Sequence, residues 1–134
     1  MDASIFASEV ISLSSVYSWT ELFKDRSIVI IDNKKAYICL LKNDENKTIE
    51  YFCPKLTPIP LSITHNIEYK HSNYSLVMNI HKYQHGEHTT SYKHCILRCF
   101  YFLQDIEHNH FHMMNHLTLK SRLSYDELIE KLVL

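Results

Sequence analysis

The sequence predicts an α+β fold, mostly antiparallel β, in which about seven strands form a sandwich or a partly open barrel. An N-terminal helical segment precedes the strands, and a C-terminal helix caps them. From Ser27 onward, β-branched and aromatic residues alternate with polar ones, and short polar turns separate these stretches. No internal repeat, low-complexity tract or linker divides the chain, so we expect a single domain over residues 1–134.

The N-terminal part of the chain favours helix. Apolar side chains occur at helical spacing along residues 3–16 and at Tyr17, which follows them. The others are Phe6, Val10 and Leu13. The sequence SWTE, residues 18–21, has the form of a capping box and predicts a short helical turn through Leu22 and Phe23.

The middle of the chain predicts strands with period-two alternation. Pro54, Pro58 and Pro60 interrupt them and mark a loop, because proline cannot donate a ladder hydrogen bond. The only glycine, Gly86, lies in a polar loop where a positive φ is expected. The last predicted strand, residues 110–120, also fits a helical stripe, and both interpretations stay open. The predicted strands are residues 27–32, 36–42, 47–53, 61–70, 74–83, 92–103 and 110–120.

The C-terminus predicts an amphipathic helix. Residues 124–127, SYDE, form a second capping box. The apolar face that follows consists of Leu128, Ile129, Leu132 and Val133.

Seven strands with mostly short connections and one closing helix resemble the pleckstrin-homology-like fold (PH-like), over residues 27–134. The resemblance is to strand count and order, and it rests on no family motif. It implies two orthogonal sheets capped by the C-terminal helix. It also implies, as an alternative function, that basic residues of the first hairpin bind phosphoinositides. Lys34 and Lys35 lie in that turn, where paired lysines are also typical of protection against edge-to-edge association.

Composition narrows the functional classes. A net charge of −1 argues against a general nucleic-acid binder, whose affinity comes from clustered Lys and Arg. No apolar run approaches the roughly 20 residues that a membrane-spanning helix needs. The first residues lack a basic region and a cleavage site, so we expect a cytoplasmic or nuclear protein. In that compartment the four cysteines are expected to be buried thiols.

A histidine-rich segment near the C-terminus has the spacing of a C2H2 zinc finger. Cys95, Cys99, His112 and His116 follow the pattern C-x3-C-x12-H-x3-H. We expect residues 92–103 to run as a straight strand, which separates the two cysteine backbones by about 13 Å, too far for one zinc ion. We therefore assign no metal ligand and no cofactor.

No enzyme is indicated by the motifs in the chain. The G-x-S-x-G, P-loop, dinucleotide-binding and H-E-x-x-H patterns are all missing from the sequence. Cys53 beside the proline loop is the thiol that a cysteine nucleophile would use, but a core position at a strand end explains it better. We assign no catalytic residue.

These observations favour a non-enzymatic protein–protein interaction module, an adaptor or complex subunit. We expect it to bind another protein by strand addition or by helix docking, and to form homo- or hetero-oligomers. Two alternatives stay open, a zinc-dependent nucleic-acid-binding protein that uses residues 95–116 and a viral host-interaction factor. The predicted contact residues are Phe6, Val10, Tyr17 and Trp19 in the N-terminal segment and Pro58, Ile59 and Pro60 in the proline loop.

Overall fold

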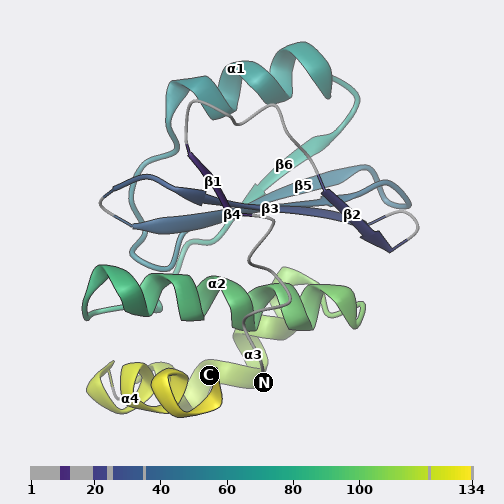
Figure 1. The fold of residues 1–134 in the computed structure, drawn as a ribbon. Coiled ribbons are helices and arrows are strands. Elements are labelled where there is room, and N and C mark those ends of the chain that lie inside the picture. Colours follow the sequence, from purple (N-terminus) through teal and green to yellow (C-terminus); the bar gives the residue numbers. More distant parts are fainter. Residues whose placement is uncertain (1–9, 13–19, 24–25, 35, 121, 134) are drawn as a thin grey trace.

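The protein forms one open mixed sheet and four helices within the residues that the computed structural model describes, 10–12, 20–23, 26–34, 36–120 and 122–133 (Figure 1). The α+β class is therefore confirmed. The sandwich or barrel of about seven strands is wrong, because a single sheet is present there and no second sheet faces it. The PH-like resemblance fails with it.

Four strands form the body of the sheet. They are β3 (Arg26–Asp32), β4 (Tyr37–Asn43), β5 (Thr48–Phe52) and β6 (Ser75–Met78). The first three are antiparallel neighbours, and β6 is parallel to β5. Two short strands, β1 (Val10–Ser12) and β2 (Thr20–Phe23), both pair with β3. Along the strand order β1-β3-β4-β5-β6, β6 ends the sheet on the side away from β1.

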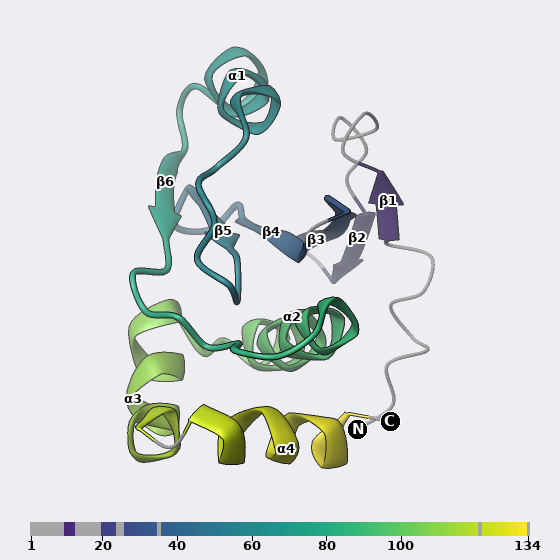
Figure 2. The same cartoon turned by 90° about the vertical axis from the view of Figure 1, so that its left-hand side faces the viewer.

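Helices cover both faces of the sheet (Figures 1 and 2). Helix α1 (Leu61–Lys70) joins β5 to β6 and lies on one face. Helix α2 (His88–Leu103) lies against the other face, and α4 (Arg122–Leu132) lies beyond α2. Helix α3 (His108–Leu119) lies beside α2, on the side of β6, and leads toward α4 (Figure 2). No helix in the described ranges is long and apolar enough to cross a membrane.

Two hydrophobic cores follow from this layering. Along β3 the side chains alternate between them, with Ile28 and Ile30 facing α2 and Val29 and Ile31 facing α1. A sheet covered on both faces has strands that are apolar throughout, which explains the uninterrupted run IVII in β3. The predicted hairpin of residues 27–42 is confirmed, as is the strand that follows it.

Residues 61–70 form a helix, and the predicted strand there is wrong. Helix α1 begins directly after Pro60, whose carbonyl accepts hydrogen bonds from Ile63 and Thr64. Only Ile63, Asn66 and Ile67 are buried, at helical spacing. Leu61 and Tyr69, which completed the alternating pattern, are 73% and 90% exposed. His65 is exposed as well.

Residues 92–103 are also helical, and the straight strand predicted there is wrong. Residues 94–99 of α2 are all buried, because α2 lies between β4 on one side and α4 on the other. A helix covered on both sides loses its polar stripe, so its sequence resembles that of a buried strand.

The remaining predictions have mixed outcomes. The C-terminal helix is confirmed as α4, and residues 108–119 take the helical alternative. The strand predicted at 74–83 is shorter, Ser75–Met78. In the N-terminal part, residues 10–12 and 20–23 are strands and not helix, while the other residues of that prediction lie outside the described ranges. Gly86 has no positive φ, and Lys34, Lys47, Leu56 and Asp105 have one instead.

Candidate functional site

The proline loop lies beside β6, at the edge of the sheet. Pro58 is exposed, and Ile59 and Pro60 are half-buried. Val10, the described contact residue of the N-terminal segment, lies in β1 and packs against the α2-side core. Because β1 and β6 end the sheet on opposite sides, the structure does not bring Val10 and the proline loop together. Phe6, Tyr17 and Trp19 lie outside the described residues.

The outer side of β6 carries backbone groups that no described strand pairs with. The Ser75 N–H donates to the Lys47 carbonyl at 2.8 Å, so the backbone of Ser75 faces β5. In a parallel pair this orientation alternates along the strand, and Val77 therefore also faces β5. The N–H and C=O groups of Leu76 and Met78 face outward, away from the sheet.

After Ser75, the side chains along this edge are apolar. Leu76 is 37% exposed, Met78 46% and the following Ile80 76%. Proteins usually protect an edge strand by keeping it short or by placing a lysine, proline or bulge in it; β6 is short, at four residues, but contains no lysine, proline or bulge. The structure therefore presents an edge that is open to another strand.

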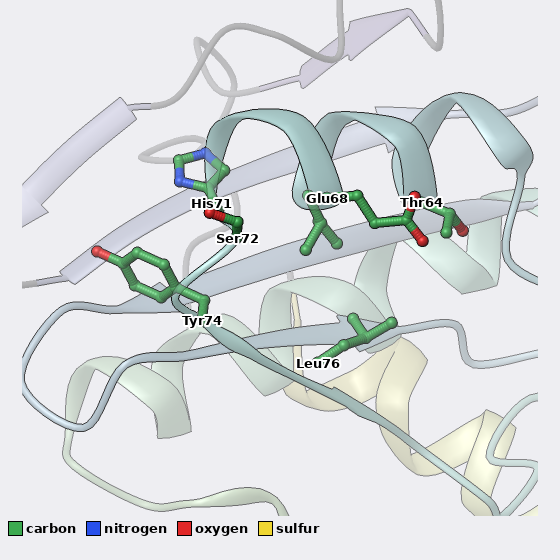
Figure 3. A pocket seen from close by; sticks show the side chains of 7 residues that line it. Thr64, Glu68, His71, Ser72, Tyr74 and Leu76 are labelled. Carbon is green, nitrogen blue, oxygen red and sulfur yellow. The ribbon is translucent and has the colours of Figure 1, made fainter.

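Three cavities border β6, and each adjoins a different residue of the strand. The Leu76 pocket, about 200 Å³, lies between Leu76, Tyr74 and the α1 residues Thr64, Ile67 and Glu68. Figure 3 shows Thr64 and Glu68 on the side of α1 above Leu76. The Val77 pocket, about 190 Å³, lies between Val77, Thr48, Glu50 and the α3 residues His108 and Asn109. The Met78 pocket, about 370 Å³, is lined by Leu56, Pro58, Ile59, Met78 and Ile80, with Tyr51 in its wall.

The pockets alternate between the two faces of the sheet. Leu76 and Met78 have their pockets on the α1 side, whereas the Val77 pocket is on the α3 side. This alternation matches the side-chain period of a β-strand. A strand added along β6 would thus have a cavity for each of three successive side chains.

Asn79 fixes the chain at the end of β6. Its amide group accepts a hydrogen bond from the Cys53 N–H at 2.9 Å and donates one to the Cys53 carbonyl at 2.8 Å. The Asn79 side chain is 5% exposed. It makes the two hydrogen bonds to Cys53 that the backbone of β6 would make if the strand continued. It also donates to the His81 carbonyl at 3.0 Å, so the chain leaves the sheet at this point.

The hydroxyl of Tyr74 helps to hold the other end of β6. It donates a hydrogen bond to Asp44 in the turn between β4 and β5. This bond, together with burial, raises the pKa of Tyr74 to about 12. Lys47 lies over the same ring, 5.1 Å from its centroid.

A buried ionic network lies beneath the Val77 pocket. Arg98 of α2, which is fully buried, donates two hydrogen bonds to the Glu50 carboxylate, at 2.9 and 2.7 Å, and a third to the Ile106 carbonyl at 2.8 Å. His108 Nδ1 lies 3.3 Å from Glu50 Oε2. Burial alone would raise the pKa of Glu50, but Arg98 and His108 outweigh it and hold that pKa below its ordinary value. Through Ile106 this network joins the α2–α3 loop, residues 104–107, to the sheet, and a separate pair of Arg26 with Asp105 joins the same loop to β3.

A His–Asp pair joins α2 to α4. His94 Nε2 lies 2.9 Å from Asp126 Oδ1, and the His94 ring is buried. Burial lowers the pKa of His94, although the hydrogen bond to Asp126 acts in the opposite direction. The second Asp126 oxygen accepts the His85 N–H at 3.0 Å. Since both oxygens serve neighbouring elements of the fold, we assign the pair a structural role.

The zinc-finger spacing does not produce the arrangement of a finger. Cys95 and Cys99 lie one helical turn apart in α2, fully buried in the core with Cys39. Burial raises the pKa of all three thiols, which keeps them protonated and unreactive. His112 of α3 stacks on His81, with ring centroids 3.7 Å apart. Among the described residues, no group of three or more His, Cys, Asp or Glu side chains is placed to hold a metal ion.

The candidate site contains two contact residues that the sequence predicted, together with residues of β6 that it did not predict as contacts. Pro58 and Ile59 line the Met78 pocket. The alternation in residues 74–83 places Leu76, Met78 and Ile80 on one face of the predicted strand, and all three are exposed. Their shared face could be predicted from the alternation, whereas the position of their strand at the sheet edge could not.

No family model, curated protein or solved structure matches this chain.

Proposed function

We propose that this protein is a non-enzymatic interaction module that binds an extended segment of another protein as an added strand along β6. The observation that supports this most is the open edge itself, where Leu76 and Met78 present outward backbone groups beside exposed apolar side chains. Strand addition takes its affinity from backbone hydrogen bonds and its specificity from pockets for alternate side chains.

The three pockets define the kind of segment that fits. Two successive side chains on the α1 face would enter the Leu76 and Met78 pockets, and the side chain between them would face the Val77 pocket. Glu68 borders the Leu76 pocket, whereas no charged residue lines the Met78 pocket. The segment would therefore carry a polar or basic residue two positions from an apolar one.

The cysteines support a cytoplasmic or nuclear location for this module. All four are free and buried in the structure. Unpaired thiols are the ordinary state in a reducing compartment.

Selection from a displayed library of random peptides tests the proposal. Peptides selected on the wild-type protein should bind Leu76→Pro about tenfold more weakly, because this change removes one outward N–H and disturbs the added ladder. The inward bonds of Ser75 and Val77 to β5 stay intact, so the variant should fold.

Leu76→Ala is the matched control, since it shortens the same side chain but keeps the backbone N–H. It should weaken binding less than Leu76→Pro does. Peptides that bind both variants as tightly as the wild type would show that the bound segment lies elsewhere, and would refute strand addition at β6.

A further inference from the structure

Resting on the proposed function, we infer that the added segment carries a lysine or arginine at its middle position, where this basic side chain faces the Val77 pocket and pairs with Glu107. The middle residue lies between the two that face the Leu76 and Met78 pockets, so its side chain points to the α3 side of the sheet. The Val77 pocket, about 190 Å³, lies on that side. Its charge therefore decides which middle residue fits.

The wall of the Val77 pocket is acidic. Glu50 and Glu107 line it, whereas no lysine or arginine of the described residues does. Thr48 and Asn109 add oxygen atoms that can accept hydrogen bonds. A basic side chain of the segment would gain a counterion and hydrogen bonds there, while an acidic one would meet like charge.

Glu107 is the carboxylate that remains for the segment. Both oxygens of Glu50 accept hydrogen bonds from Arg98, at 2.9 and 2.7 Å, so Glu50 already has its counterion. Glu107 is held more loosely, since its Oε1 lies 3.5 Å from Asn43 Nδ2 and 3.6 Å from Arg26 Nη1. Its side chain is 47% exposed, and a residue entering from outside the sheet can therefore meet it.

The neighbouring positive charges do not cancel the charge of Glu107. Arg26 pairs with Asp105 and also lies near Glu107, so one guanidinium serves two carboxylates. Helix α3 begins at His108, and a helix N-terminus carries a partial positive charge of about half a unit. Half a unit is less than the full negative charge that is left over. With neutral histidines, the pocket keeps a net negative charge.

The same charge argues against a second copy of this chain as the added strand. Within β6 the backbone groups of Leu76 and Met78 face outward, so an antiparallel pair of two β6 strands that uses both would place the Val77 residues of the two copies opposite each other. The two acidic pockets would then lie on one face of neighbouring strands and repel each other. A basic segment from another protein has the complementary charge.

Peptides selected from the displayed library test the inference. They should share a lysine or arginine, and replacing it with glutamine in a synthetic peptide should weaken binding to the wild-type protein about threefold at low ionic strength, the value of a partly exposed ion pair. Glu107→Gln should remove this difference between the two peptides. Binding is measured at pH 8, where histidine side chains are ordinarily neutral.

Glu127→Gln is the matched control, because it removes one negative charge from an exposed position on α4. It should keep the threefold difference. Glu107→Lys should reverse the preference, so that a peptide with glutamate at the middle position binds it more tightly than the lysine peptide does. A difference that persists in Glu107→Gln, or that disappears in Glu127→Gln, would overturn the pairing with Glu107.

Leu76→Pro separates this inference from the proposed function. Peptides that bind Leu76→Pro weakly, and whose basic residue depends on Glu107, would support both. Peptides that bind Leu76→Pro weakly but share no basic residue would overturn the inference alone. A basic residue that depends on Glu107 in peptides unaffected by Leu76→Pro would overturn strand addition, and with it the middle position. Peptides with neither dependence, or a library without any binder, would overturn both.

Discussion

Glu50 and Arg98 are two charged side chains inside the core, and each satisfies the other. Removing one partner leaves the second charge buried without a counterion. We predict that Arg98→Met lowers the free energy of unfolding by about 3–5 kcal/mol, measured by urea denaturation at neutral pH.

The double variant Glu50→Gln, Arg98→Met serves as the control for this prediction. It removes both charges, so it should be more stable than Arg98→Met alone. A double variant that is less stable than Arg98→Met would contradict the role given to the ion pair.

His94 makes stability depend on pH. Its folded-state pKa is lowered by burial, so below about pH 6.5 the unfolded chain binds the proton more readily than the folded protein does. The stability contributed by neutral His94 is therefore fully present above about pH 6.5 and declines as the pH falls toward the folded-state pKa. We predict that His94→Gln loses less stability than the wild type between about pH 7.5 and about pH 5.5.

Urea denaturation across this range checks the prediction. The exposed His65 offers a matched change, and His65→Gln should keep the wild-type slope. Identical slopes for His94→Gln and the wild type would show that His94 does not carry the effect.

At the level of elements, the sequence predicted correctly those helices and strands that local sequence patterns determine. The β-branched residues on both sides of a polar turn predicted the hairpin of β3 and β4, and the apolar stripe predicted α4. The predicted capping box at residues 124–127 is wrong, because α4 already begins at Arg122. Helix α1 was misassigned because Leu61, Ile63, Ile67 and Tyr69 also alternate, although only Ile63 and Ile67 are buried. Helix α2 was misassigned because its coverage by β4 and α4 removes the polar stripe that distinguishes a surface helix.

The junction between β5 and β6 depends on one side chain, Asn79. Its amide group makes both ladder bonds to Cys53. Asn79→Ala leaves these buried backbone groups unpaired, so we predict a loss of about 1–3 kcal/mol in the free energy of unfolding and faster hydrogen exchange at the Cys53 amide.

Asn73→Ala is the corresponding exposed change and should leave both quantities near their wild-type values. If the Cys53 amide exchanged equally slowly in Asn79→Ala, another group would have to hold the end of β5.

For the whole molecule, the candidate site depends on topology that the sequence did not reveal. Period-two alternation showed that Leu76 and Met78 share a face, and the prolines marked the neighbouring loop. The crossover through α1 places β6 at the end of the sheet, and only this position leaves the outer backbone groups of β6 without a described partner strand. Pairing between distant strands is decided by tertiary packing, which one sequence does not display.

Amide hydrogen exchange along β6 tests the central claim most directly. In the free protein, Val77 should be protected by its bond to β5, while Leu76 and Met78 should exchange rapidly because their N–H groups face outward. A selected peptide should slow exchange at Leu76 and Met78 and leave Val77 nearly unchanged. A bound peptide that leaves Leu76 and Met78 exchanging as fast as before, and protects another surface, would contradict the assignment of β6 as the binding edge.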